Sequence, residues 1–147
     1  AGPLILSGAI ATGRAILAAQ AMGADLAYIG SPFIATDEAN ASAAYKQSIV
    51  AAGADDIVYS SLFTGVHGNY LRASIVAAGL DPDALPEGER STMDFTSGAA
   101  KAWRDIWGAG QGIGAVTAVE PARRRIERLI TEYAGAKAEL ARKTGLC

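Results

Sequence analysis

The sequence predicts an α/β fold, because it opens with a strand–helix–strand unit whose two strands would run parallel. The segments Pro3–Leu6 and Leu26–Ile29 are short apolar runs of the kind that forms buried strands. Between them, an alanine-rich segment from about Thr12 to Met22 carries apolar residues at helical spacing, and Gly23 would end that helix. A helical connection of this length is what two parallel strands require.

A glycine turn directly follows each predicted strand. The turns are Ser7-Gly8-Ala9 and Gly30-Ser31-Pro32. The carboxyl ends of neighbouring parallel strands lie at one edge of a sheet, where α/β folds bind their ligands. Turns without bulky side chains leave backbone N–H groups open to an anion, and Ser31 followed by Pro32 has the pattern of a helix N-cap. The two turns predict a phosphate site; the alternative is that Gly8 and Gly30 only relieve crowding at the strand ends.

The rest of the chain predicts further helices around one extended segment. We expect helices from Thr36 to about Ala52, over Tyr70–Ala78, over Ser97–Trp107 and from Glu120-Pro121 to about Lys143, the last with an apolar face made of Ile126, Leu129, Ile130 and Tyr133. Asp56–Leu62 is expected to be extended, with loops or turns over Thr64–Asn69, 80–93 and Gly108–Gly112. In this interpretation residues 1–147 belong to one domain, in which 57–96 form a loop and helical excursion and 119–143 the C-terminal helix.

The composition excludes several classes of protein. A net charge of −2 over 147 residues gives no electrostatic footprint for nucleic acid. No apolar stretch approaches the roughly 20 residues that span a bilayer. The only cysteine is Cys147, which rules out an internal disulfide framework and a cysteine-rich metal site. We therefore expect a cytoplasmic protein without metal, nucleic-acid or membrane partners.

The number of predicted strands is too small for a closed sheet. Two clear strands and one doubtful strand cannot complete a (β/α)₈ barrel, which needs roughly 200 residues or more. The loops after the last two strands of such a barrel, together with a short extra helix, form its recurrent phosphate site. The chain also begins at Ala1-Gly2-Pro3 and enters a strand at once. We expect it to be the C-terminal portion of a TIM barrel, with the last two strands, the phosphate-binding helix and additional helices.

Several motifs resemble the C-terminal part of the nitronate monooxygenase (2-nitropropane dioxygenase) family. Three of them lie at Ser7–Arg14, Met22–Asp25 and Ile29–Thr36, and Ala109–Gly114 is similar to a motif shared with flavin-dependent enoyl-ACP reductases. The resemblance implies a (β/α)₈ barrel that holds FMN non-covalently and oxidises alkyl nitronates with O₂.

The same resemblance implies which residues would hold FMN. Gly8 and Ala9 would give backbone amides to the FMN phosphate, the second half of the grip would be formed by Tyr28, Ile29, Gly30 and Ser31, and Gln111 would lie near the cofactor mouth. The usual Gly-Gly pair of the family is Gly8-Ala9 in this sequence. Because Ala9 carries a Cβ, its turn should avoid a strongly positive φ.

No catalytic residue is assigned in this chain. In the family, a histidine on an earlier barrel loop contacts flavin and substrate. The only histidine here, His67, lies downstream of the phosphate loops and does not match that position. We expect the chain to supply the phosphate site but not the catalytic half, and to need the N-terminal half of the barrel or a homo-oligomer. The alternatives are an enoyl-ACP reductase-like barrel, an IMP-dehydrogenase-like barrel, or a non-catalytic domain that binds a phosphate ligand.

Three other groups of residues are expected to have structural roles. Arginines and glutamates alternate in a pattern typical of a solvated helix face, at Glu120, Arg123, Arg124, Arg125, Glu127, Arg128 and Glu132. Four aspartates lack metal-ligand spacing and are expected in turns or caps: Asp55, Asp56, Asp81 and Asp83. Trp103 and Trp107 are four residues apart and are expected to pack.

Overall fold

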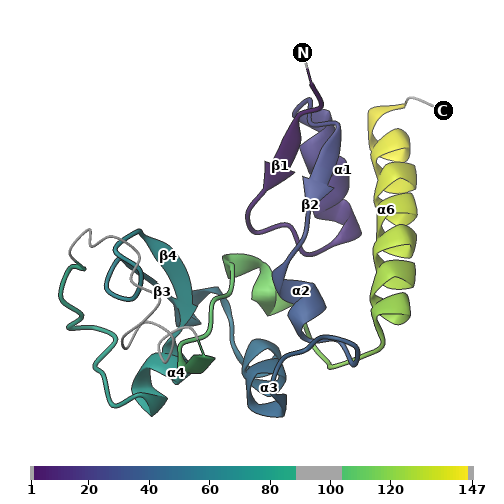
Figure 1. The fold of residues 1–147 in the computed structure, drawn as a ribbon. Coiled ribbons are helices and arrows are strands. Elements are labelled where there is room, and N and C mark those ends of the chain that lie inside the picture. The colour runs from purple at the N-terminus through teal and green to yellow at the C-terminus, as the bar shows by residue number, and fades with distance from the viewer. Residues whose placement is uncertain (1, 89–103, 146–147) are drawn as a thin grey trace.

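A computed structural model describes residues 2–88 and 104–145 of the chain. Its elements form three groups along the molecule (Figure 1). The two N-terminal strands lie with the first and last helices at one end, and a second pair of strands lies at the other. Two short helices and a 3₁₀ turn lie between these groups. The helix expected over 97–107 falls largely outside the described residues, as do Trp103, positions 89–93 of the expected loop, and Cys147.

The predicted strand–helix–strand unit is confirmed. Strands β1 (Ile5–Ser7) and β2 (Leu26–Tyr28) pair in parallel, with Ile5 opposite Leu26. Helix α1 (Gly13–Ala21) connects them. The Thr12 hydroxyl accepts the Ala15 N–H at 3.2 Å and so caps the helix start, while Gly23 ends the helix with a φ of +95°.

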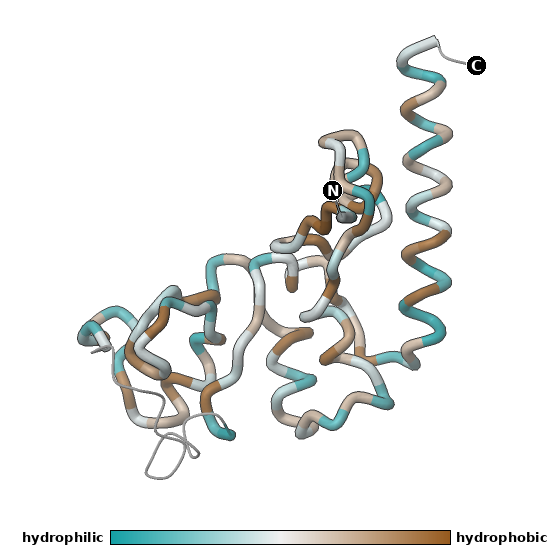
Figure 2. Tube along the Cα trace, turned by 45° about the horizontal axis from the view of Figure 1, so that its top comes forward, coloured by the Kyte–Doolittle hydropathy of each residue, from teal (hydrophilic) through white to brown (hydrophobic). Residues whose placement is uncertain are grey.

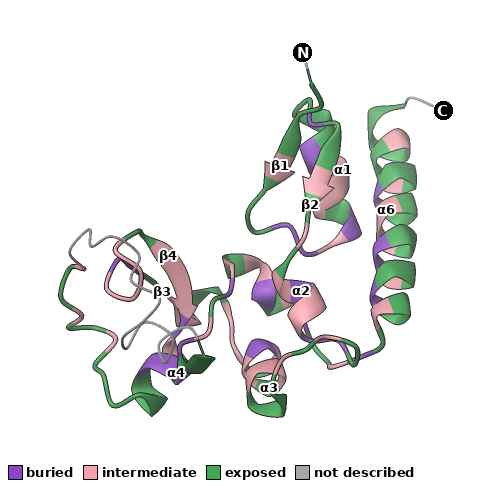
Figure 3. Cartoon of the chain, in the orientation of Figure 1, coloured by how far each residue is buried: buried purple, intermediate pink, exposed green. Residues whose placement is uncertain are grey.

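The prediction that both strands are buried is wrong. Leu4, Ile5, Leu26 and Tyr28 are each more than half exposed, and Figure 3 shows large green areas on this strand pair. Side chains alternate across a strand, so only every second one faces α1. Those that do, among them Leu6 and Ala27, pack on a cluster formed by Ile10, Ala19 and Ala24. In the described part of the chain, the opposite face of the strand pair is uncovered.

The long C-terminal helix is also confirmed, but its buried face differs from the predicted one. Helix α6 (Ala122–Thr144) packs against α1 and buries Arg125, Leu129 and Ala136. Ile126 and Ile130 are 48% and 62% exposed instead. Figure 2 shows apolar and polar residues alternating along α6, without one continuous brown stripe. Because α6 meets only α1 along most of its length, its buried stripe is narrow.

The second pair of strands forms a hairpin that the sequence predicted only in part. Strand β3 (Ile57–Ser60), which follows the 3₁₀ turn η1 (Ala54–Asp56), confirms the extended segment. It pairs antiparallel with β4 (Gly68–Leu71). Gly68 and Asn69 were expected in a loop and Tyr70 and Leu71 in a helix, but α4 spans only Arg72–Ala77. The excursion at 57–96 therefore contains a β-hairpin as well as loop and helix.

Residues 107–109 extend this sheet by lying along β4. The Leu71 N–H donates to the Trp107 carbonyl at 2.8 Å, and the Ala109 N–H donates to the Asn69 carbonyl at 3.2 Å. Tyr70 and Gly108 form an antiparallel bridge between the two bonds. The segment expected to be a flexible turn is thus partly fixed by backbone hydrogen bonds.

The central group holds the main apolar core. It consists of α2 (Ser31–Ile34), α3 (Ala43–Ala51) and the 3₁₀ helix η2 (Gln111–Ala115). Their shared core contains Ala35, Ile49, Leu71, Ala109, Ile113 and Val116. Helix α3 begins after Ser42, whose hydroxyl accepts the Tyr45 N–H, and not at Thr36 as predicted. Thr36 instead pairs in a parallel bridge with Glu120, so it is not available to start a helix.

No helix within residues 2–88 and 104–145 combines the length and the apolar character needed to cross a membrane.

Candidate phosphate site

Three segments far apart in the sequence meet in a pocket at the carboxyl ends of β1 and β2. Its wall is formed by residues 7–10, residues 28 and 30–32, and residues 110 and 112. The first two segments are the predicted glycine turns. The parallel pairing of Ser7 with Tyr28 brings the ends of the two strands together, and the turns follow directly from them.

Five of the seven predicted site residues line this pocket: Gly8, Ala9, Tyr28, Gly30 and Ser31. The other two do not. Ile29 packs toward α1 with the N-terminal apolar cluster. Gln111 is exposed, and its Nε2 donates to Asn69 Oδ1 at 3.4 Å. Its two neighbours in the sequence, Gly110 and Gly112, do line the pocket.

The third wall of the pocket is not predicted by the sequence. Gly110 and Gly112 belong to a glycine-rich run whose composition predicts only a turn. A Cβ at Gly112 would lie 2.8 Å from the Ala9 carbonyl oxygen, so only glycine lets η2 approach the first turn this closely. The glycines at alternate positions of that run are the sequence signal for such a close approach. The partner of Gly112, Ala9, lies about a hundred residues earlier, so local patterns do not identify it.

The first turn has a conformation that the sequence did not predict. Gly8 has a φ of +100° and Ala9 a φ of +51°. Ala9 was expected to avoid a strongly positive φ; its φ is smaller than that of Gly8 but still lies in the left-handed region. The left-handed region costs an L-residue about 1–2 kcal/mol. The backbone conformation of Ala9 therefore raises the free energy of the folded state at this turn, which forms part of the pocket wall.

The crowding explanation for the two glycines is not supported. A Cβ built at Gly8 or at Gly30 would meet no atom within 4 Å. Gly30 also has an ordinary φ of −113°, so neither backbone conformation nor a neighbouring atom in the described chain requires glycine there. A side chain at position 30 would occupy open space at the pocket wall.

Ser31 does not cap a helix as predicted. The N-cap of α2 is Gly30, and Ser31 is the first helical residue. Its Oγ accepts the Gly110 N–H at 2.9 Å and so connects the second and third walls of the pocket. Because α2 has only four residues, its dipole adds little to anion binding.

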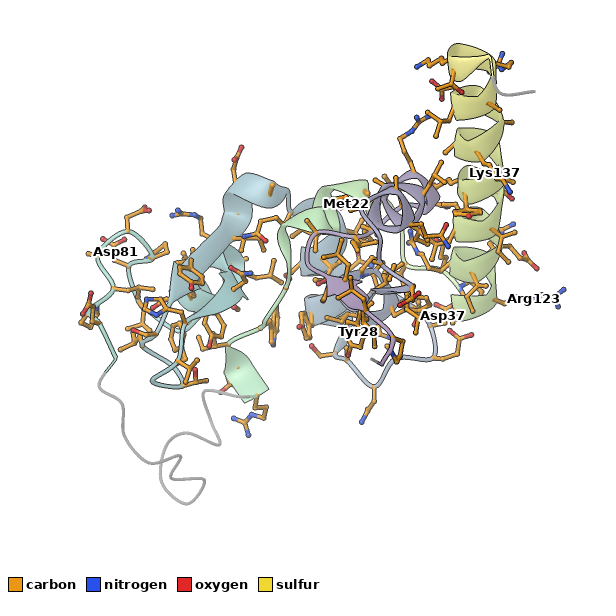
Figure 4. The ribbon with its side chains drawn as sticks, turned by 90° about the horizontal axis from the view of Figure 1, so that it is seen from above. Met22, Tyr28, Asp37, Asp81, Arg123 and Lys137 are labelled. Carbon is orange, nitrogen blue, oxygen red and sulfur yellow. The ribbon has the colours of Figure 1, made fainter. Side chains whose placement is uncertain are left out.

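The pocket wall carries little charge. Among its described residues only Tyr28 has a titratable side chain, and this side chain is largely exposed. Figure 4 shows Tyr28 on the side of the molecule near α6, whereas Asp81 lies at the opposite end. Backbone N–H groups and the hydroxyl-bearing residues Ser7, Tyr28 and Ser31 are therefore what this wall offers to an anion.

The arginines of α6 do not all lie on a solvated face, as predicted. Arg123 points away from the body of the molecule and pairs with Glu127 at 2.8 Å (Figure 4). The Arg125 side chain, in contrast, is only 1% exposed, and its Nη2 lies 2.7 Å from Oε1 of the buried Glu120. Burial lowers the pKa of the Arg125 guanidinium, and the Glu120 carboxylate acts against this shift.

The other side chains singled out in the sequence have structural roles. Asp56 accepts the Gly53 N–H, Asp81 accepts the Asp83 N–H, and Asp83 forms a two-bond pair with Arg72. Within 2–88 and 104–145, no cluster of three metal-binding side chains occurs. His67 stacks on Tyr59 with ring centres 4.8 Å apart, outside the pocket wall, and Trp107 stacks on Tyr45.

Comparison with known proteins decides the family. The sequence model of one family, Nitronate monooxygenase, matches residues 2–132. The chain belongs to the nitronate monooxygenase family. This is a family of flavin-dependent oxidoreductases, in agreement with the resemblance found in the sequence.

Individual relatives match parts of the chain. A nitronate monooxygenase of Paraburkholderia phytofirmans is 29% identical over 98 residues, which are 67% of this chain and 26% of that protein. The structure of nitroalkane oxidase from Streptomyces ansochromogenes matches with a TM-score of 0.73 at 29% identity, over 94% of this chain and 41% of that one. A FabK mutant from Thermotoga maritima matches with a TM-score of 0.72 at 25% identity, over 95% and 44% of the two chains. The chain thus spans less than half the length of these proteins.

Proposed function

We propose that this chain provides the FMN-phosphate site of a nitronate monooxygenase and forms the C-terminal part of its (β/α)₈ barrel. The complete enzyme would oxidise alkyl nitronates with O₂. Membership of the family and the similarity to a nitroalkane oxidase structure support this reaction. The parallel pairing of β1 with β2, and the uncovered face of that pair, support a place in a larger sheet.

The observation that carries the proposal is the open space at Gly30, on the wall of the pocket that also holds the Gly8 turn. Nothing in the described chain would collide with a Cβ at Gly30, and its φ of −113° does not require glycine. At Gly8 the φ of +100° already favours glycine. A ligand that needs close approach to the backbone accounts for the glycine at position 30, since a side chain would occupy the ligand's volume. The two turns and the Ser31 hydroxyl suit a phosphate, which accepts several hydrogen bonds.

The residues of this chain would bind and orient the cofactor. The Gly8, Ala9 and Gly30 N–H groups would donate to phosphate oxygens, and Ser31 would add its hydroxyl proton. FMN, when bound, supplies the redox chemistry of the reaction. Because no described residue of the pocket wall is a histidine or a carboxylate, we propose that the base acting on the substrate comes from another part of the barrel.

Ligand binding with and without a phosphate tests the proposal. Titration of the full chain with FMN and with riboflavin, followed by amide resonances in NMR spectra, should shift Gly8, Ala9 and Gly30 for FMN only. The Gly30→Val variant should weaken FMN binding by about tenfold or more, equivalent to about 1.4 kcal/mol. Gly114→Val is the matched control, because Gly114 is also exposed and free of neighbours but lies outside the pocket wall.

Equal responses to FMN and riboflavin, or no response to either, would overturn the assignment of a phosphate site. The reaction is tested separately with the complete enzyme, by O₂ uptake with an alkyl nitronate. An enoyl-ACP substrate in the same assay tests the reductase alternative. Bound flavin without turnover of either substrate would favour a non-catalytic binding domain.

A further inference from the structure

Ser31 occupies a position from which it can act on two parts of the molecule. Its Oγ accepts the Gly110 N–H at 2.9 Å, across 79 positions of sequence. A hydroxyl has one proton to donate besides its lone pairs. Among the described residues, the structure gives no acceptor to that proton. The hydroxyl lies on the pocket wall, so its proton is available to an anion there.

The segment held by Ser31 continues directly into the hairpin sheet. Ala109, next to Gly110, donates its N–H to the Asn69 carbonyl, and Trp107 accepts the Leu71 N–H. On the other side of Gly110, the Gln111 side chain donates to Asn69 Oδ1. Residues 107–111 are therefore bonded to β4 on both sides of the one amide that Ser31 holds.

We propose that Ser31 is a positioning residue that couples occupancy of the pocket to the placement of residues 107–112 beside the hairpin. This inference rests on the proposed phosphate site. When an anion accepts a hydrogen bond from the Ser31 hydroxyl, the Gly110 N–H, the hydroxyl and the anion form a hydrogen-bond chain in one direction. Such chains strengthen each member. Without the anion the hydroxyl can rotate away and release the Gly110 N–H.

The coupling has a consequence beyond the pocket. A ligand shifts an equilibrium only as far as it binds one state better than the other. The phosphate would bind better to the state in which the Ser31 hydroxyl holds the Gly110 N–H, because only that state offers it the hydroxyl proton in this orientation. The effect on residues 107–112 should therefore depend on the phosphate and on Ser31 together. Ser31 would then report the filled phosphate site to Gln111 and to the hairpin edge.

Hydrogen exchange of the full chain tests this coupling. With saturating FMN, exchange at the Gly110 amide should slow at least about threefold relative to the free chain. Saturating riboflavin, which lacks the phosphate, should leave it unchanged. Ser31→Thr keeps the hydroxyl and should preserve the FMN effect, whereas Ser31→Ala should abolish it while FMN still shifts the Gly8 and Ala9 amides. If Ser31→Ala does not fold, Ser31→Cys replaces it, because a thiol is a weak acceptor of similar size.

The outcomes separate this inference from the proposed function. If FMN fails to shift the amides of Gly8, Ala9 and Gly30, the phosphate site itself is wrong. If FMN shifts them but leaves Gly110 exchange unchanged, the coupling is wrong and the site stands. An equal slowing of Gly110 exchange in the wild type and in Ser31→Ala would also overturn the role of Ser31.

Discussion

At the scale of single residues, Ala9 shows how a binding turn can work against stability. Its φ of +51° lies in the region that favours glycine, while its side chain is exposed and the turn forms part of the pocket wall. Strained backbone of this kind persists where the surrounding structure determines the conformation. Here the neighbouring constraints are Gly8 and the close approach of Gly112 to the Ala9 carbonyl.

Replacement of Ala9 by glycine should therefore stabilise the protein. Relief of the left-handed penalty, about 1–2 kcal/mol, should exceed the loss from a more flexible unfolded chain, about 0.4–1 kcal/mol. Ala78→Gly is the matched control, because Ala78 is also exposed but has a φ of −80° and should lose stability. Denaturant unfolding of the two variants should give free-energy changes of opposite sign. Destabilisation of both would contradict strain at Ala9.

At the scale of elements, the contact between α1 and α6 depends on one glycine. A Cβ at Gly13 would lie 2.2 Å from the Tyr133 nitrogen and 2.3 Å from the Leu129 carbonyl oxygen, both in the α6 backbone. The Glu132 carboxylate accepts the Gly13 N–H at 2.8 Å in the same place. Arg14 and Glu139 form a second polar contact between these helices.

Gly13→Ala should push the two helices apart and destabilise the protein. Overpacking of this kind costs about 1–3 kcal/mol, more than the helix propensity gained from alanine. Gly135→Ala in α6 is the control, since its added methyl meets no atom within 4 Å. That variant should stabilise the protein by up to about 1 kcal/mol. Denaturant unfolding gives the free energy of unfolding of each variant. An unchanged value for Gly13→Ala would show that the two helices are not in close contact in solution.

The same pair of helices should respond to acid through Glu139. Hydrogen bonds from Arg14 and Lys143 lower the pKa of this carboxyl from its ordinary 4.5 to about 2. A lowered pKa in the folded state means that the contribution is present above pH 4.5 and is lost as the pH falls toward 2. Carbonyl NMR titration should give the lowered pKa directly. Glu139→Gln should reduce the loss of stability between pH 4.5 and 2, and an unchanged profile would contradict the contact.

At the scale of the whole molecule, Glu120 joins the central group to α6. Its backbone N–H donates to the Ala35 carbonyl and its carbonyl accepts the Asp37 N–H. Its side chain, 7% exposed, contacts both Arg125 and Arg128. Within the described chain, Oε1 of Glu120 and Nε of Arg125 have no partner with hydrogen-bond geometry. The 2.7 Å approach between the two residues is therefore mainly an interaction of buried charges.

Loss of one buried charge should destabilise this connection strongly. Glu120→Gln leaves the Arg125 guanidinium buried without its counter-ion, which costs about 3–5 kcal/mol in comparable pairs. Glu127→Gln breaks an exposed pair and should cost at most about 1 kcal/mol. Thermal and denaturant unfolding measure both. The double variant Glu120→Gln/Arg125→Met should recover part of the loss; no recovery would argue against the unpaired charge as its cause.

Local patterns in the sequence were sufficient for the elements that depend on local interactions. β1, α1, β2 and α6 follow from apolar runs, helical spacing and capping residues close in sequence. Three of the failures share one physical cause, which is a distant partner. Thr36 could start a helix but pairs with Glu120, and Ser31 could cap one but accepts the Gly110 N–H. Arg125 has the composition of a solvated helix face, and only the buried Glu120 permits its burial.

The distance in sequence between the residues of the pocket wall also affects when the pocket can form during folding. Gly8, Ser31 and Gly110 come from the beginning, the first third and the last third of the chain, and the Ser31–Gly110 bond closes a loop of 79 positions. Loop closure must be completed before such a contact contributes any free energy. The β1–α1–β2 unit can fold from neighbouring residues, and we expect the third wall to join it later, because residues 107–109 are hydrogen-bonded to β4 of the hairpin. The binding site should therefore be among the last parts of the chain to fold. A ligand that binds this site should slow the unfolding of the protein more than it speeds its folding.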